Sequence, residues 1–481
     1  MVPVIGFAPD ADQTTQGLLA DCENLIPALI GMEGGPTAVT PPSVPALAAA
    51  CLGAAVVYKL DNTRRLFAGS QTMLYELVSG TWTDRSRAGN YAAGTDSRWS
   101  YAQFGDATLA CSGSEVIQRS TTGAFADIAT APRAEILFSV GAFVMALNTN
   151  DGAVKPDGWH CCAVFDDTDW TPSITTQAAS GRLVATPGRI TAGARLGEYA
   201  IAYKERSIYL GQYVGAPVVW DWIQVPGGSA GCVGKNALCD IGGVHFFVGH
   251  DNFWLFDGTR PQPIGDGVIR QWFVNNCSRE FIQKTVCTFD RENNRVWIFY
   301  PSVGSTECDA ALVYHVQSQK WGRANRSIQC ALTYVSPGYT IDGMSAISAT
   351  IDGMPSISFD SQFWNAASSS LAVFNASNQL QTLSGASDAS SLTTGEVGDD
   401  GAVMLLQQIR FRYALAPASA TVQTRYMANS GETFADGVSG ALNDGKFDTL
   451  KAARWHKAMV DFVGPVRVTH MNATMKPAGT R

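Results

Sequence analysis

The segment WHCC at 159–162 offers one imidazole and two thiolates, which are ligand types that zinc binds in proteins. Neighbouring residues of a strand point to opposite faces, so both thiolates cannot easily reach one ion. No second pair of ligands follows at the spacing of a zinc finger. The sequence therefore predicts a structural core at this segment and no metal site.

The segment GGSAGCVGKN at 227–236 ends in the Gly-Lys pair of a phosphate-binding loop. That motif has a glycine where Ser229 stands, and a serine or threonine that ligates magnesium where Asn236 stands. Both departures remove groups that hold a nucleotide and its metal. Nucleotide binding is therefore not expected here.

Three carboxylates, Asp166, Asp167 and Asp169, precede Trp170 in the segment DDTDW. Paired carboxylates can hydrolyse glycosides, but only at a defined separation that a sequence does not give. The segment is similar to the Asp-box turns of sialidase propellers, which stabilise turns and do no catalysis. No His-Glu-x-x-His motif occurs either. We therefore expect a solvated turn at this segment, and a protein without enzymatic activity, cofactor or metal.

Basic and aromatic residues stand side by side in RFRYA at 410–414 and in AARWHK at 452–457. Arginine beside tryptophan can grip the backbone and bases of nucleic acids. The same residue types are enriched at interfaces between protein subunits. Both interpretations stay open, and we favour the interface. The candidate docking residues are Arg410, Arg412, Arg454, Trp455 and Lys457.

The elements that carry these residues are short strands, because one strand–turn–aromatic pattern recurs along most of the chain. Three or four apolar or aromatic residues lead into a polar or glycine turn, and a Trp or Phe then closes the hairpin. Copies lie roughly 40 to 60 residues apart, the spacing of a four-stranded propeller blade. They occupy residues 74–82, 116–125, 208–220, 254–258, 312–321 and 371–380.

We expect an all-β fold with a β-propeller of six or seven blades over residues 56–387. An extended N-terminal arm precedes it over 1–55, where Pro41 and Pro42 exclude a helix. A polar linker follows over 388–401. Alternating segments such as LLQQIRFRYAL then indicate a small, sandwich-like C-terminal β domain over 402–481 that serves as a docking platform.

Charge is scarce and unevenly distributed. Charged residues make up 16% of the chain, below the usual quarter or so, which suggests that partner subunits cover much of the surface. The net charge is −8, yet residues 402–481 carry ten Lys and Arg against five Asp and Glu. This leaves −13 on the first 401 residues and +5 on the remainder. An acidic body with a basic end favours docking by charge complementarity.

Eleven cysteines, an odd number, lie mostly in apolar strand-like runs, as reduced core thiols do. We therefore expect assembly in a reducing cytoplasm and at most one disulfide. The longest apolar stretch, at 46–58, has 13 residues. A membrane helix needs about 20, so no membrane insertion is expected.

The chain resembles the tail nozzle proteins of short-tailed bacteriophages, also called tail tubular protein B or packaged-DNA stabilisation proteins. The order and spacing of five segments carry the resemblance, which spans about 21–481. They are DCENLIPALIGMEGGP, RLFAGSQTMLYELVSGTWTD followed by WSYAQFGDATLAC, GEYAIAYKERSIYLGQYVGAPVVWDWIQV, HFFVGHDNFWLFDG with IGDGVIRQWF, and the doublet TIDGMSAIS/TIDGMPSIS.

This resemblance implies a structural virion protein with no catalytic residues. Six copies would form a homohexameric ring at the distal end of the tail, below the adaptor that joins head to tail. Tail fibre or spike proteins would be further neighbours. The ring would narrow or close the DNA channel, touch genomic DNA transiently, retain it and open for ejection. An acidic wall suits this role because it repels phosphate and avoids tight binding.

Two other classes stay open. A glycan-binding or glycan-cleaving propeller, meaning a lectin or depolymerase, would have a cleft with paired carboxylates and stacked Trp. A general protein-interaction propeller would be a monomer with one exposed binding face.

Overall fold

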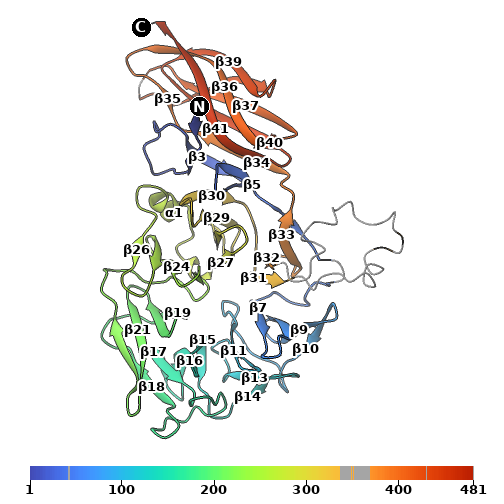
Figure 1. Ribbon diagram of the computed structural model, residues 1–481, viewed down its shortest axis with the longest axis vertical. Helices are drawn as coiled ribbons and strands as arrows, with labels where there is room; N and C mark the ends of the chain where they lie inside the picture. Colours follow the sequence, from blue (N-terminus) through green and yellow to red (C-terminus); the bar gives the residue numbers. More distant parts are fainter. Residues whose placement is uncertain (42–43, 336–347, 349, 351–368, 430, 480–481) are drawn as a thin grey trace.

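A computed structural model describes residues 1–41, 44–335, 348, 350, 369–429 and 431–479. A β-propeller forms the lower part of Figure 1 and a β-sandwich its upper part. Helical structure in the described residues is limited to α1 (Arg270–Asn276) and the 3-10 turn η1 (Ile282–Lys284). The expected all-β propeller with a sandwich-like C-terminal domain is confirmed. The TIDG doublet lies outside the described residues except at 348 and 350.

Six four-stranded antiparallel sheets form separate blades around one axis. Five of them are local meanders in which sequence order is also sheet order. They comprise β7 (Gly53–Tyr58), β8 (Arg64–Gly69), β9 (Leu74–Val78) and β10 (Thr81–Asp84); β11 (Ser100–Phe104), β12 (Ala107–Cys111), β13 (Gln118–Ser120) and β14 (Ala126–Asp127); β15 (Arg133–Val140), β16 (Phe143–Asn150), β17 (Val154–Cys161) and β18 (Ala179–Arg182); β19 (Ile190–Leu196), β20 (Tyr199–Lys204), β21 (Ile208–Gly215) and β22 (Val219–Gln224); and β23 (Leu238–Asp240), β24 (His245–Val248), β25 (Phe253–Phe256) and β26 (Gln262–Pro263).

The last blade takes its fourth strand from the other end of the chain. It contains β31 (Cys330–Val335), β32 (Ser369–Phe374), β33 (Leu380–Gly385) and the N-terminal β6 (Thr37–Val39). A further four-stranded meander, β27 (Val286–Asp290), β28 (Arg295–Tyr300), β29 (Ala310–His315) and β30 (Lys320–Ala324), fills the ring between β23 and β31. The first strand of the first blade, β7, packs against β31 and so closes the circle.

The recurrent sequence pattern falls on the outer hairpins of the blades. Residues 74–82 form β9 and β10, residues 208–220 reach from β21 into β22, and residues 312–321 lie in β29 and β30. The closing aromatic is buried: the Trp321 ring centroid lies 4.7 Å from that of Tyr314 and 4.8 Å from that of Phe253. The pattern recurs because each blade needs a tight turn and then a large side chain to fill the space beside its neighbour.

Turn residues in the hairpins adopt the backbone conformation that the sequence indicates. Asn62, between β7 and β8, has a φ of 64°, and Asn294, between β27 and β28, has a φ of 54°. Asparagine tolerates this left-handed region better than most residues. These two turns therefore fix where the paired strands begin.

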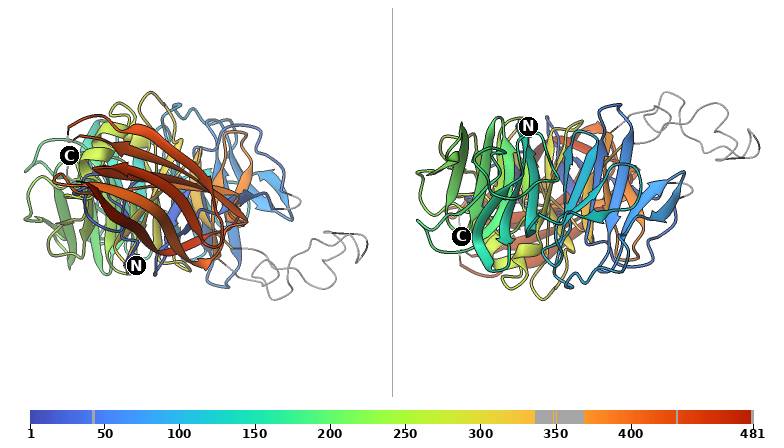
Figure 2. Two further views of the ribbon diagram at one scale, coloured as in Figure 1. Left: turned by 90° about the horizontal axis from the view of Figure 1, so that it is seen from above. Right: turned by 90° about the horizontal axis from the view of Figure 1, so that it is seen from below.

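The C-terminal sandwich has one layer of long strands and a second layer that covers it (Figure 2). Its core includes Phe411, whose ring centroid lies 6.2 Å from Phe447 and 6.2 Å from Phe462, each edge to face. The long-strand layer holds β36 (Val403–Leu415), β39 (Lys446–Ala453) and β41 (Arg467–Gly479); the second holds β34 (Ala389–Thr394), β35 (Val397–Gly398), β37 (Ser419–Met427), β38 (Ala435–Ala441) and β40 (Trp455–Val463).

The segment 388–401, which the sequence suggests is a linker, contains β34 and β35, and both pair with β40. Its low hydrophobicity has a structural reason. In β34 the inward-facing positions are Ser390, Leu392 and Thr394, so two of the three buried side chains are small and polar. Such a strand has no apolar alternation for a sequence reading to detect.

The N-terminal strands join the propeller to the sandwich, where Figure 1 shows them in blue. β4 (Leu25–Pro27) pairs with β30 of the propeller and with β5 (Met32–Gly34), which pairs with β41 of the sandwich. One ten-stranded sheet therefore runs from the β27–β30 unit into the sandwich. β1 (Val2–Pro3) adds to β41, and β2 (Gly6–Phe7) with β3 (Leu18–Glu23) extends the second sandwich layer. The two parts of the molecule are thus joined by backbone hydrogen bonds.

Candidate interaction surfaces

The WHCC segment lies at the end of β17 and continues into a buried turn. His160 Nε2 donates to the Trp170 carbonyl oxygen at 2.7 Å, and burial lowers the pKa of His160. Trp170 Nε1 in turn donates to the carbonyl oxygen of Asp167, whose carboxylate lies 2.6 Å from Arg119 Nε. These contacts hold a turn together. The described residues contain no group of three or more His, Cys, Asp or Glu side chains that could hold a metal ion.

The glycine-rich loop at 227–236 is shaped by packing. A Cβ on Gly234 would lie 2.1 Å from the Gln283 carbonyl oxygen, and one on Gly231 would lie 2.3 Å from the Glu205 carbonyl oxygen. Only glycine fits at such approaches. Residues 227–231, GGSAG, also match the Gly-x-Ser-x-Gly pattern of serine hydrolases, in which the serine sits between a strand and a helix. Here exposed Ser229 is followed by strand β23, so the nucleophile geometry is not present.

Three of the candidate docking residues, Arg454, Trp455 and Lys457, lie together at the start of β40. Trp455 Nε1 donates to Asp400 Oδ1 at 2.6 Å, and Arg454 donates to the Asp400 carbonyl oxygen. Lys457 Nζ lies 2.9 Å from a Glu396 carboxylate oxygen. These three side chains hold the segment 396–400 against the sandwich.

The other two candidates, Arg410 and Arg412, lie on β36 in the opposite layer. Phe411 between them faces the core, so both arginines face outward, and Arg412 is exposed. On β40, His456 and Ala458 are buried, so Trp455 and Lys457 face outward from the other layer. The five residues therefore divide between two faces of the sandwich. Layer assignment depends on pairings between distant strands, so this division cannot be predicted from residue types and spacing alone.

A group of ion pairs spans the central axis of the propeller, at the end where the first, innermost strand of each blade begins. This group was not predicted from the sequence. Lys284, just before β27, lies 2.9 Å from Asp96 and 2.6 Å from Glu307. Arg98, just before β11, lies 3.2 Å from Glu307, and Lys235, just before β23, donates to the Arg98 carbonyl oxygen. The strands β11 and β27 are not neighbours in the ring. We call these five residues the cross-axis cluster.

Within the cross-axis cluster, Lys284 and Asp96 stabilise each other's charged forms. A hydrogen bond from Lys284 holds the pKa of Asp96 below its usual value. Burial acts to lower the pKa of Lys284, but its bonds to Glu307 and Asp96 outweigh burial and raise that pKa. A sequence signal exists in retrospect, since Arg98, Lys235 and Lys284 each precede an inner strand by two or three residues.

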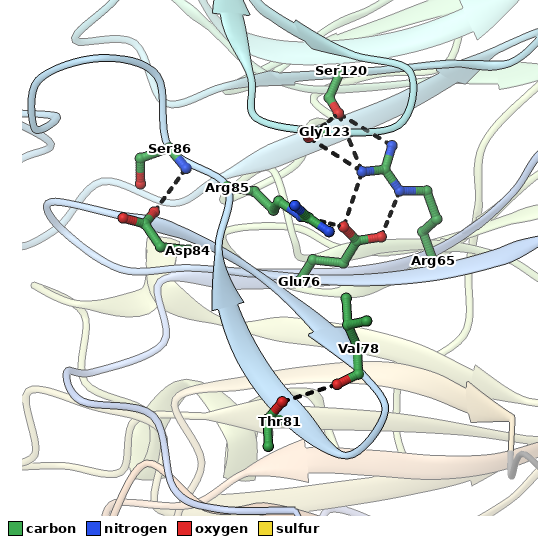
Figure 3. Close-up of polar contacts among 9 residues, drawn as sticks. All are labelled: Arg65, Glu76, Val78, Thr81, Asp84, Arg85, Ser86, Ser120 and Gly123. Carbon is green, nitrogen blue, oxygen red and sulfur yellow. Dashed lines mark hydrogen bonds and ion pairs between the residues drawn. The ribbon is translucent and has the colours of Figure 1, made fainter.

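A second ion-pair network joins two neighbouring blades, as Figure 3 shows. Arg65 Nε in β8 lies 2.6 Å from Glu76 Oε1, and Arg85 Nε lies 2.7 Å from Glu76 Oε2. Arg65 also donates to Ser120 Oγ of the next blade at 3.2 Å. Burial acts to raise the pKa of Glu76, but the two arginines outweigh it, so the pKa lies below its usual value. This network stabilises the packing of one blade on the next.

A third network lies where the propeller meets the sandwich. Glu33 of β5 forms ion pairs with Arg295 of β28 and with Arg467 of β41. Burial acts to raise the pKa of Glu33, but the two arginines hold it below its ordinary value of 4.5. Three cavities of about 360, 310 and 290 Å³ surround this network.

The 310 Å³ cavity is the one with most carboxylates. Its lining includes Glu33, Asp290, Glu292 and Trp297. Trp297 is only 1% exposed and stacks on Phe299 with ring centroids 5.7 Å apart. Its face is therefore not free to stack on a sugar ring.

Comparison with known proteins gives matches only to solved structures. No protein-family model matches the sequence, and the search of curated proteins found no match. YCF48 bound to D1 peptide has 12% identity and a TM-score of 0.35, over 60% of this chain and 84% of that chain. PorZ, described as an essential bacterial surface component of the type-IX secretion system of Porphyromonas gingivalis, has 11% identity and a TM-score of 0.37, over 60% of this chain and 34% of that chain. The computationally designed Ika8 protein has 8% identity and a TM-score of 0.37, over 70% and 97%.

The helical segments of the described part of the chain are the short helix α1 and the 3-10 turn η1. None of its helices has the length and apolar character to cross a lipid bilayer.

Proposed function

We propose that this chain is a non-enzymatic structural subunit in the tail of a short-tailed bacteriophage. Six copies form a ring at the distal end of the tail, below the adaptor that joins head to tail. The ring narrows or closes the DNA channel, retains the packaged DNA and opens for ejection. The protein is assembled in the host cytoplasm and resides in the virion, where tail fibre or spike proteins are neighbours.

The observation that carries this proposal is a body in which one sheet joins the propeller to the sandwich. One sheet continues from the β27–β30 unit through β4 and β5 into β41, so the sandwich is fixed to the propeller. Residues 402–481 carry a net charge of +5 and the rest of the chain −13. Such a body suits stacking in a tail, because outward basic side chains of segment 402–481 can face an acidic rim while acidic residues elsewhere on the chain repel DNA.

The cross-axis cluster bears on where DNA passes in such a ring. Lys284, Arg98 and Lys235 tie opposite sides of each propeller together along its own axis. The proposed DNA path therefore runs between the six subunits and not through a single propeller.

The direct test is the number of copies in the particle. Quantitative mass spectrometry of purified virions, normalised to the portal protein, is expected to give six copies per tail. Images of isolated tails should place them in one ring at the distal end. A single copy, a trimeric spike or absence from the virion contradicts the proposal.

The alternative function is glycan binding or cleavage, and the acidic 310 Å³ cavity favours it. Asp290, Glu292 and Glu33 supply carboxylates there, whereas the buried Trp297 offers no stacking surface. Titration with surface polysaccharides of candidate hosts tests it. Saturable binding or cleavage that is lost in Glu292→Gln would favour the alternative over the nozzle.

A further inference from the structure

β22 is the outermost strand of its blade, and its outer edge has no partner in the sheet order of the described residues. The outermost strands of the other local blades are shorter. β10 and β18 have four residues each and β14 and β26 have two, whereas β22 has six. Proteins commonly protect sheet edges by keeping the edge strand short. β22, on the outer rim beside β21 in Figure 1, lacks that protection.

The side chains around β22 also lack the usual protection by charge. Residues 208–234 contain a single charged residue, Asp221. Ile223 is 54% exposed, and Val218 and Val214, at the tip of the hairpin, are 58% and 50% exposed. Lysines, bulges and prolines commonly prevent an edge strand from pairing with another strand. In this hairpin the bulge and Pro217 lie at the tip and not along β22. The strand itself is therefore open to another strand.

The backbone direction identifies which groups of β22 face the free edge. Val225 N–H donates to the Ile208 carbonyl oxygen of β21 at 2.9 Å. In an antiparallel ladder the direction alternates along a strand, so residues 223 and 221 also bond β21. Trp222 and Gln224 therefore present their N–H and C=O groups outward. Trp220 presents its C=O outward, while its N–H is already used in the turn.

We propose that β22 pairs antiparallel with β22 of a second copy of this chain, with the two-fold axis at Trp222. This register places Trp222 opposite its own copy, where both N–H···O bonds can form, and Gln224 opposite Trp220, where the Gln224 N–H can donate to the Trp220 carbonyl oxygen. Asp221 then lies opposite Ile223 of the second copy. The sequence VWDWIQ is thus complementary to itself, which favours a second copy over an unrelated strand as the partner.

The neighbouring registers are less favourable. A two-fold axis at Asp221 would set the two carboxylates opposite each other, and like charges in that position destabilise a pair. An axis at Ile223 would set Pro226, which has no N–H, opposite Trp220. Only the Trp222-centred register avoids both problems.

This inference is independent of the proposed ring. A two-fold contact uses the same patch on both copies and yields a pair, so it cannot by itself close a ring of six. It describes the isolated chain in solution, whereas ring stoichiometry is measured in the particle. If one of the two proposals fails its experiment, the result therefore does not decide the other proposal.

The experiment measures self-association of the full chain by sedimentation velocity over a concentration series. The wild type is expected to form a dimer. In the variant Ile223→Lys, the new ammonium group lies opposite Asp221 of the second copy, so the dimer Kd should fall about three- to tenfold. In Ile223→Asp, the new carboxylate lies opposite Asp221, so the dimer Kd should rise by a similar factor. Each change acts at two symmetric pairs. Ile223 is exposed, so both variants should keep the wild-type melting temperature.

Val303→Lys and Val303→Asp are matched controls, because Val303 is 66% exposed and lies in the loop between β28 and β29. Neither should change the dimer Kd. A wild type that stays monomeric up to the highest soluble concentration overturns the proposal. So does a dimer that responds alike to Lys and to Asp at position 223.

Discussion

Lys284 is the side chain on which the cross-axis cluster depends. Its side chain is 5% exposed, while its partners Asp96 and Glu307 are 65% and 55% exposed. A buried ammonium group needs partners, because desolvation without compensation is costly. Asp96 supplies that compensation from the opposite side of the ring, and Glu307 supplies it from the same four-stranded unit as Lys284. The pairs Lys284–Asp96 and Arg98–Glu307 therefore link blades across the ring.

Replacing Lys284 with Met should therefore lower the free energy of unfolding by about 1–3 kcal/mol, since two ion pairs are lost but the remaining carboxylates are solvated. Differential scanning calorimetry of the full chain measures the change as a lower melting temperature. Lys155→Met is the control. The pair of Lys155 with Asp151 is 2.7 Å long, but its two side chains are 32% and 29% exposed, and its loss should cost less than about 0.5 kcal/mol. Equal effects of the two substitutions would contradict a special role for the cluster.

Glu33 gives the junction between propeller and sandwich a dependence on pH. Its pKa in the folded protein is below the ordinary value of 4.5, because Arg295 and Arg467 outweigh burial. A lowered folded pKa means that the stabilisation is present above pH 4.5 and is lost as the pH falls through the folded value. The melting temperature of the wild type should therefore fall on acidification in that window.

The variant Glu33→Gln tests this sign. It should melt lower than the wild type at neutral pH, and the difference between the two should shrink as the pH falls below 4.5. Melting curves of both proteins across this range decide the matter. A difference in melting temperature that is the same at every pH would show that the charge of Glu33 does not contribute to stability.

Strands that are local in sequence were predictable, and strands that pair across the whole chain were not. The hairpins at 74–82 and 312–321 carry their own turns and closing aromatics, so the blades follow from nearby residues. β6 is only three residues long, and it pairs Thr37 with Gly385, far away in the sequence. Nothing local marks such a strand, and the region 1–55 therefore looks like a free arm although it is paired along much of its length.

The candidate site illustrates the same limit. Arg454, Trp455 and Lys457 are candidates by residue type, and all three make polar contacts. Their partners Glu396 and Asp400 come from a segment that the sequence presents as a linker. Residue types and spacing indicate which side chains interact, while strand pairing decides whether the partner is another part of the same chain.

Gly322 in β30 tests the connection between the propeller and the N-terminal strands. A Cβ at this position would lie 2.5 Å from the Leu25 carbonyl oxygen and 2.8 Å from the Cα of Ile26, which are backbone atoms of β4. Gly322→Ala should therefore destabilise the protein by about 1–3 kcal/mol through forced displacement of β4. Thermal melting measures it.

Gly123→Ala is the matched control, because a Cβ there would meet nothing within 4 Å and no positive φ opposes it. Its effect should stay within about 0.5 kcal/mol. If Gly322→Ala were as mild as this control, the β30–β4 contact would not carry the junction.

The molecule as a whole joins a propeller to a sandwich through one sheet, and the sandwich contains segment 402–481 with its ten Lys and Arg. We therefore expect the docking face at outward arginines of the sandwich whose side chains do not hold another segment of the chain in place. Arg454 and Lys457 do not qualify, because they hold segment 396–400, and reversing their charge would test folding as well as docking. Arg412 on β36 is exposed and is the cleaner probe.

Arg412→Glu should therefore reduce incorporation of the chain into tails without lowering its melting temperature, because it reverses charge on the outward face of β36 and disturbs no ion pair of the described residues. Complementation of a phage that lacks the gene, followed by quantification of the protein in purified particles, measures the effect. Arg189→Glu serves as control: Arg189 is similarly exposed but lies on the propeller, where its nearest carboxylate, Glu205, is 3.9 Å away. Normal incorporation of Arg412→Glu would remove this face of the sandwich as the docking end and would leave the charge asymmetry of the chain without a function in assembly.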